Sequence, residues 1–217
     1  MNDILIGIAS TIIGYLLGSI SFSRVVTRFV SPGLDLKKTL VPVLGSEEKI
    51  QMAAISATSV RFSLGPKYGL LASFLDMVKV AVPVMIFHYV FPASPADYLA
   101  ATGGIIGHNW PLYYKFNGGY GQSPIYGALM VLDWRGILVN FFGTSILFLF
   151  FKQVHIASLG GVLLLIPWFY FFRHDPFAML YAGFCSVAYF IRVLPDYKAM
   201  REVLKRKSNT EEGTESG

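Results

Sequence analysis

Long apolar stretches separated by short polar segments dominate this chain. A transmembrane helix needs about 20 apolar residues, and somewhat fewer where neighbouring helices bury it. The pattern predicts seven spans, at residues 4–23, 68–91, 97–113, 122–133, 136–151, 154–172 and 177–194. The fourth is too short to cross as an ordinary helix and must be tilted, extended or re-entrant. We therefore expect an all-α, polytopic membrane bundle of about seven transmembrane helices.

The basic residues predict the orientation of this bundle. If the N-terminus lies outside, all but three of the 18 Lys and Arg residues lie inside or at inner helix ends, many of them in the loop 24–67. The exceptions are Arg135 and Arg173, which lie outside, and Lys79, which lies within a span. This distribution follows the positive-inside rule and predicts that the C-terminus lies inside.

The composition agrees with a membrane protein. Charged residues make up 14% of the chain and hydrophobic residues 54%, whereas soluble domains carry about 25% charged residues. The net charge of +5 fits topology and anionic lipid headgroups better than nucleic acid, which we do not expect as a partner. Residues 1–207 are the predicted transmembrane domain. Residues 208–217 carry no apolar side chain and are predicted to be a disordered cytoplasmic tail. The basic run 196–207 is expected to lie along the inner membrane surface.

Two local spacings indicate helices that pack on one another. Gly14-xxx-Gly18 and Gly103-xxx-Gly107 are small-xxx-small patterns, which let membrane helices approach closely. Asp76 and Lys79 are three residues apart and so share a helix face. An opposite charge is the natural partner for a charge inside a membrane bundle. The pair is either an internal ion pair that orients helices or part of an active site.

A glycine-rich segment carries the strongest chemical signal. Gly118, Gly119 and Gly121 occupy three of four positions, and their backbone N–H groups can converge on an anion. His108, Asn109 and Lys115 lie just upstream. The segment predicts a phosphate-binding loop, with a simple tight turn as the alternative. The sequence contains no Gly-Lys-Ser/Thr phosphate loop, and its histidines show no metal-ligand spacing.

Four segments together resemble the bacterial acyl-phosphate:glycerol-3-phosphate acyltransferases, which are seven-helix membrane enzymes. They are residues 14–22, residues 55–69, the helix of Asp76 and Lys79, and residues 108–121. The last resembles the family motif G-H-N-F-P-x-F-x-K-F-x-G-G-K-G. The resemblance covers residues 10–135 in matched order.

The resemblance implies an enzyme of phospholipid biosynthesis in the bacterial plasma membrane. It would move an acyl group from acyl phosphate to glycerol 3-phosphate, form lysophosphatidic acid, and need no metal or organic cofactor. His108, as a base or donor, and Asn109, as a positioning amide, are the catalytic candidates; capping a helix end is the alternative for each. The substrate-binding candidates are Lys115, Gly118, Gly119, Gly121, Ser123, Thr58, Ser59, Arg61, Lys67, Asp76 and Lys79. Membrane lipids are the other expected partners, and the sequence does not determine the oligomeric state.

The chain also departs from the family pattern. Met52-Ala53-Ala54 stands where the family has Ser-Gly-Asn, and Ser59 stands where it has Asn. Phe62 and Asn117 each stand where the family has Arg, and Tyr120 stands where it has Lys. The family's H-R-x-N-like run near the C-terminus has no counterpart. Two further hypotheses therefore stay open. One is a paralogue that keeps the fold and acts as a lipid-binding or regulatory membrane subunit. The other is a small transporter, suggested by the charges of Asp76 and Lys79 inside a predicted membrane span.

Overall fold

The structure is a computed structural model that describes residues 2–215, without the side chains at positions 208 and 210–215. The first half contains α1 (Asp3–Gly18), α2 (Phe22–Val30), the 3-10 turn η1 (Leu36–Lys38), β1 (Leu40–Pro42), β2 (Lys49–Gln51), α3 (Ala57–Leu64) and α4 (Pro66–Val90). The second half contains α5 (Ala96–Asn109), the 3-10 turn η2 (Leu112–Tyr114), α6 (Gln122–Leu132), α7 (Trp134–Phe151), α8 (Val154–Leu163), α9 (Leu165–Trp168), the π-helical turn η3 (Phe169–Arg173) and α10 (Pro176–Glu215).

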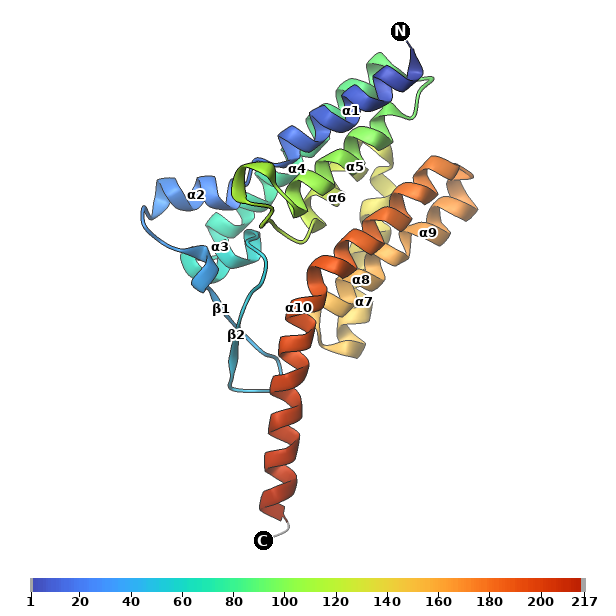
Figure 1. Ribbon diagram of the computed structural model, residues 1–217. Helices are drawn as coiled ribbons and strands as arrows, with labels where there is room; N and C mark the ends of the chain where they lie inside the picture. The colour runs from blue at the N-terminus through green and yellow to red at the C-terminus, as the bar shows by residue number, and fades with distance from the viewer. Residues whose placement is uncertain (1, 216–217) are drawn as a thin grey trace.

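The helices form two groups that meet along α5, α6 and α10. In the first group, α5 packs on α1 and α4, and α6 packs on α4; in the second, α8 packs on α7 and α10. Contacts of α10 with α5 and of α6 with α7 join the groups. Figure 1 shows the N-terminus at one end of the bundle and α10 extending beyond the other end. The glycine-rich segment, between α5 and α6, lies at the end from which α10 emerges.

The two small-xxx-small patterns meet in one seam between α1 and α5, as their spacing predicts. A Cβ on Gly18 would overlap the carbonyl of Gly104, and a Cβ on Gly107 would overlap the carbonyl of Tyr15. Only glycine permits this backbone-to-backbone contact, which is how membrane helices gain packing energy without a hydrophobic driving force. The seam fixes the end of α5, and therefore the position of the segment that follows it.

The outer surface of the bundle is strongly apolar. Leu70, Tyr89, Leu149 and Phe150 are each more than 70% exposed, which a soluble surface would not tolerate in such numbers. Among the described residues, five helical segments are long and apolar enough to cross a membrane: residues 3–30, 66–90, 134–151, 154–173 and 176–207. The expectation of an all-α membrane bundle is confirmed. The count of seven crossings and the orientation of the termini stay predictions.

Several predicted span boundaries were wrong. The first expected span, 4–23, lies within the apolar segment 3–30, in which α1 ends at Gly18 and α2 begins at Phe22. α5 ends at Asn109 rather than residue 113, because the residue before Pro111 is disfavoured in helical conformation. The sixth span, 154–172, divides into α8, α9 and a π-turn. α6 has only 11 residues, so the fourth span is as short as the sequence suggested.

The region 24–67, expected to be a long loop, is largely structured. It contains α2, α3 and the two-stranded antiparallel hairpin of β1 and β2. The basic run 196–207 was expected to lie along the membrane surface, but it continues α10 through Pro195 as one helix and points away from the bundle (Figure 1). The predicted disordered tail stays a prediction: α10 extends to Glu215, and residues 216–217 lie outside the described residues.

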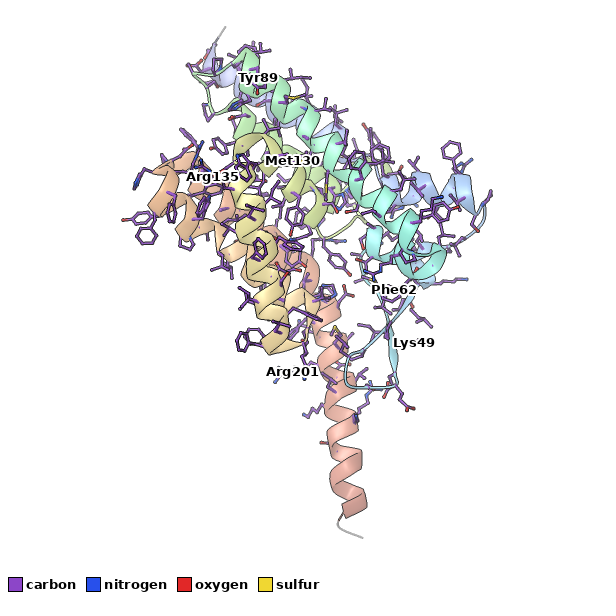
Figure 2. The ribbon with its side chains drawn as sticks, turned by 180° about the vertical axis from the view of Figure 1, so that it is seen from behind. Lys49, Phe62, Tyr89, Met130, Arg135 and Arg201 are labelled. Atoms are coloured by element: carbon purple, nitrogen blue, oxygen red, sulfur yellow. The ribbon has the colours of Figure 1, made fainter. Side chains whose placement is uncertain are left out.

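Basic residues that the predicted topology puts on opposite sides of the membrane lie toward opposite ends of the bundle. Figure 2 shows Lys49 and Arg201 at the end where the hairpin and the extension of α10 lie, and Tyr89 and Arg135 toward the opposite end. The sequence analysis places Lys49 and Arg201 inside and Arg135 outside. The fold therefore separates these residues in the sense that the orientation requires.

Candidate active site

A buried ion pair anchors the site. In α4, Lys79 Nζ lies 2.6 Å from Asp76 Oδ1, and both side chains are almost fully buried. The same Nζ donates to the carbonyl of Ile20 (2.5 Å) and lies 3.1 Å from Nδ1 of His108, at the end of α5. An ammonium has three N–H donors, so these partners use all of them. This arrangement favours the internal ion pair over direct contact of Lys79 with a substrate.

The glycine-rich segment folds back on the end of α5. The amide of Gly119 donates to the carbonyl of His108 (3.0 Å), and a Cβ on Gly119 would overlap the imidazole Nε2. The His108 ring is therefore enclosed between the ion pair on one side and the loop on the other. Gly121 has φ +96°, a left-handed conformation that favours glycine. The segment therefore forms a tight bend against His108 and Asn109, and phosphate binding by this loop stays a prediction.

Asn109 is the clearest unsatisfied group at the loop. The side chain is fully buried, and neither Oδ1 nor Nδ2 has a hydrogen-bond partner among the residues that the structure describes. Its amide faces Gly121, where a Cβ would lie 2.8 Å from Oδ1. Buried polar groups are nearly always paired, so the unpaired side chain of Asn109 makes no capping hydrogen bond to a described residue, and its contact with a substrate stays a prediction.

The backbone just before the glycines is strained. Lys115 and Phe116 both adopt positive φ, at +53° and +59°, although neither is glycine. Each such residue costs about 1 kcal/mol or more and persists where its surroundings enforce it. Arg24 contributes to this enforcement, because it donates to the carbonyl of Asn117 (2.7 Å) and stacks on the ring of Tyr114 (4.5 Å to the centroid).

Helix α10 clamps the glycine loop from the other side. Arg192 donates from Nε to the carbonyl of Gly119 (2.9 Å) and from Nη2 to that of Gly118 (2.7 Å). One turn later, Asp196 accepts the hydroxyl proton of Tyr120 in a short hydrogen bond and also accepts the amide of Ala53 (2.8 Å). Burial and the neighbouring carboxylate of Asp196 raise the pKa of Tyr120, so the phenol remains a neutral donor.

A cavity of about 450 Å³ lies between α3 and α4, beside the start of α6. It is lined by Thr58, Arg61 and Ser73, among others. The hydroxyl of Ser73 is hydrogen-bonded to that of Ser123 (2.7 Å), which places the first turn of α6 at the cavity. This turn has no side-chain cap, and an uncapped helix N-terminus attracts anions. Three of the predicted binding residues, Thr58, Arg61 and Ser123, therefore belong to one region.

Three other candidates stand apart. Ser59 is fully buried; its hydroxyl donates to the carbonyl of Ala54 (3.2 Å) and accepts the amide of Ser56 (3.3 Å), so it stabilises the start of α3. Lys67 and Lys115 are exposed, and neither lines a described pocket. Among the described residues there is also no group of three or more His, Cys, Asp or Glu side chains that could hold a metal ion.

The contacts made by α10 were not predicted from the sequence. Arg192 was read only as a charge that sets topology, and Asp196 only as part of a basic run. A local signal exists: the two residues are four apart, so they share a helix face, at the point where the last apolar span ends. Nothing in the spacing, however, identifies the glycine loop as their partner.

Fold and site together define a multi-pass helical membrane protein with a glycine loop and a cationic cavity at one end of its bundle. The family model described as glycerol-3-phosphate acyltransferase matches residues 8–202. The chain therefore belongs to the glycerol-3-phosphate acyltransferase family, which confirms the resemblance seen in the sequence.

Individual relatives agree with this assignment. Glycerol-3-phosphate acyltransferase 1 of Oceanobacillus iheyensis is 28% identical over 182 residues, which cover 78% of this chain and 80% of that protein. The glycerol-3-phosphate acyltransferase of Aquifex aeolicus is 32% identical over 154 residues, or 70% of this chain and 73% of that one. The crystal structure of PlsY (YgiH), an integral membrane glycerol 3-phosphate acyltransferase, in its glycerol 3-phosphate form has a TM-score of 0.77 at 24% identity, covering 90% of this chain and 92% of that chain. That likeness establishes the fold.

Proposed function

We propose that this protein transfers an acyl group from acyl phosphate to glycerol 3-phosphate and so forms lysophosphatidic acid for phospholipid biosynthesis. The observation that carries the proposal is the glycine loop, which is held against His108 and Asn109 beside the cavity of Thr58 and Arg61. Family membership supports the reaction class, because the matched relatives are named for it. The acyl-phosphate donor follows from the resemblance of the motifs alone.

The reaction makes modest chemical demands. The acceptor's hydroxyl oxygen forms a bond to the acyl carbonyl carbon, the bond from that carbon to the phosphate oxygen breaks, and the hydroxyl proton ends on the departing phosphate. Acyl phosphate is a mixed anhydride with a good leaving group, so the site mainly has to hold two phosphate groups beside one carbonyl and exclude water. Such catalysis depends on proximity and on preorganised positive groups.

The residues supply these groups in different ways. Arg61 is exposed to the cavity and has no ion-pair partner among the described residues, so it is the proposed phosphate ligand, with Thr58 and Ser123 as hydroxyl donors. Asn109 is proposed to orient the acceptor or the carbonyl. His108 is proposed to fix the position of the glycine loop relative to the Asp76–Lys79 pair, because its Nδ1 already faces Lys79.

The proposed topology puts this site at the cytoplasmic face, with the N-terminus outside and seven crossings. The support is the positive-inside distribution of the basic residues and the position of Lys49 and Arg201 at the end of the bundle where α10 emerges (Figure 2). Glycerol 3-phosphate would then enter from the cytoplasm, while the acyl chain lies between helices in the bilayer.

The test is direct assay of the purified full-length protein in detergent. Palmitoyl phosphate and glycerol 3-phosphate are supplied, and lysophosphatidic acid and inorganic phosphate are both measured. Arg61→Gln is expected to raise KM about tenfold or more, since a charge-assisted hydrogen bond is worth about 1.5–3 kcal/mol. Lys49→Gln, an exposed residue of the hairpin, is the matched control. Absence of lysophosphatidic acid with an intact, folded protein would refute the proposal; phosphate release without that product would indicate a different acceptor.

One observation favours a second candidate, a lipid-binding or regulatory subunit without transferase activity. Tyr120, which stands where the family pattern has Lys, is neutral and paired with Asp196, and the amide of Gly119 is paired with a protein carbonyl. Two hydrogen-bond donors of the loop, the Tyr120 hydroxyl and the Gly119 amide, are thus already paired within the protein. The two candidates separate in the same assay, because the subunit would bind lysophosphatidic acid but would not form it.

A further inference from the structure

A second polar pocket lies under α2, away from the cavity of Thr58 and Arg61. It has a volume of about 250 Å³ and is lined by Arg24, Thr27, Arg28, Lys37 and Ile55, among others. We call it the α2 pocket. It shares no lining residue with the Arg61 cavity. The α2 pocket adjoins the glycine segment: the amide of Ile55 donates to the carbonyl of Gly118 (3.0 Å), and Arg24 donates to that of Asn117 (2.7 Å).

The α2 pocket is cationic. Arg24, Arg28 and Lys37 contribute three positive charges, against one carboxylate, Asp35. That carboxylate accepts the amide of Lys37 (3.0 Å) and so caps the turn η1. Arg28 and Lys37 are exposed, and no ion pair joins either side chain to another residue that the structure describes. A cluster of this kind attracts an anion, and the planar guanidinium groups suit phosphate oxygens.

A buried hydroxyl gives independent evidence for a ligand. Thr27 lines the pocket and is only 4% exposed, yet its Oγ1 has no hydrogen-bond partner among the described residues. A buried polar group without a partner is costly. A phosphate oxygen seated between Arg24 and Arg28 would accept the hydroxyl proton of Thr27 and remove that cost.

The surroundings of α2 favour a position at the membrane–water boundary. Phe29, next to Arg28, is 83% exposed, and Figure 1 shows α2 turning away from the line of α1 and projecting to the side of the bundle. A short helix with an exposed aromatic side chain beside arginines is typical of the membrane–water boundary. Both lipid headgroups and soluble phosphate esters reach this depth.

We infer that the α2 pocket is a second phosphate-binding site, in which Arg24, Arg28 and Thr27 hold the phosphate group of a monoester. The ligand is either the headgroup of an anionic lipid or a soluble phosphate ester. The experiment measures binding affinity rather than acyl transfer, so its result is independent of the proposed function.

The test measures binding to the full-length protein in neutral detergent by titration calorimetry. The soluble probe is glycerol 3-phosphate and the lipid probe is dihexanoyl phosphatidic acid. Arg28→Gln removes one charge from an exposed position, and Thr27→Val removes the hydroxyl at nearly constant volume. Lys49→Gln is the charge-matched control, and Arg61→Gln reports on the other cavity. Thermal melting of each variant verifies folding.

We expect at least a tenfold weaker affinity for one probe in Arg28→Gln and in Thr27→Val, with Lys49→Gln unchanged. Loss for the lipid probe identifies a headgroup site, and loss for glycerol 3-phosphate identifies a site for the soluble ester. The inference is overturned if the wild-type protein binds neither probe saturably. It is also overturned if affinity falls only in Arg61→Gln while Arg28→Gln and Thr27→Val bind like the control.

Discussion

Replacing Tyr120 by Phe tests whether α10 holds the glycine loop. The substitution keeps the buried ring and removes only the hydroxyl, so Asp196 loses one partner and keeps the amide of Ala53 at 2.8 Å. Asp196 is 1% exposed, so water cannot replace the lost donor freely. A hydrogen bond to a charged group contributes about 1.5–3 kcal/mol. For a domain of this size that corresponds to a fall in Tm of about 3–12 °C.

The assay is thermal unfolding of purified wild-type and Tyr120→Phe protein in the same detergent. Tyr197→Phe is the matched control, because Tyr197 packs against the same cluster and should shift Tm by less than about 2 °C. The pKa of Tyr120 is raised, so the phenol's contribution is fully present below its unfolded pKa of about 10 and is lost only as pH rises through the folded value. The difference between wild type and variant should therefore be constant from about pH 6 to 9. Equal Tm values for Tyr120→Phe and the control would refute the reasoning.

Three further outcomes follow from the contacts. Asp76→Asn should lower the free energy of unfolding by about 3–5 kcal/mol, because it leaves the ammonium of Lys79 buried without a counter-charge; chemical denaturation measures this, and a fully stable variant would contradict it. Gly107→Val should lower Tm by about 2–12 °C, because the α1–α5 seam has no room for a side chain; an unchanged melting curve would exclude the seam. Gly119→Ala should reduce acyl transfer at least tenfold, because its Cβ overlaps His108; a folded variant with wild-type turnover would exclude a role for the loop geometry.

Features set by local spacing could be predicted from the sequence. The α1–α5 seam follows from glycines four residues apart, and the pair of Asp76 and Lys79 follows from a separation of three. Both depend only on helix periodicity. The apolar runs likewise predict a membrane bundle, since hydrocarbon accepts few other spanning structures. The bend at Gly118–Gly121 could be located, because glycine tolerates the backbone conformation that a sharp turn requires.

Contacts between distant segments could not be predicted in this way. Tyr120 and Asp196 are 76 positions apart, and Arg192 reaches Gly119 across 73 positions. No periodicity connects them, because only the packing of α10 against the bundle decides which side chains meet. The α2 pocket was missed for the same reason, since it needs α2, η1 and Ile55 in one place. The continuation of α10 beyond Pro195 was not predicted either, because a basic run with Met200, Val203 and Leu204 on one side equally fits a separate helix on the membrane surface.

Several of the departures from the family pattern gather in one place. Met52, Ala54, Tyr120 and Val193 pack together with Tyr189 in a single buried cluster, although they come from three separate segments. Met52 and Ala54 stand where the family has Ser and Asn, Tyr120 where it has Lys, and Val193 follows Arg192 in the run that lacks the family's His and Asn. At these positions the chain therefore has an apolar cluster with a Tyr–Asp hydrogen bond where the family pattern has polar residues. A lysine restored at position 120 alone would meet the carboxylate of Asp196 before any phosphate, because that carboxylate is buried and already accepts a hydrogen bond from this position. Under the proposed function, we therefore expect the Arg61 cavity, rather than this cluster, to hold the phosphate groups of the substrates.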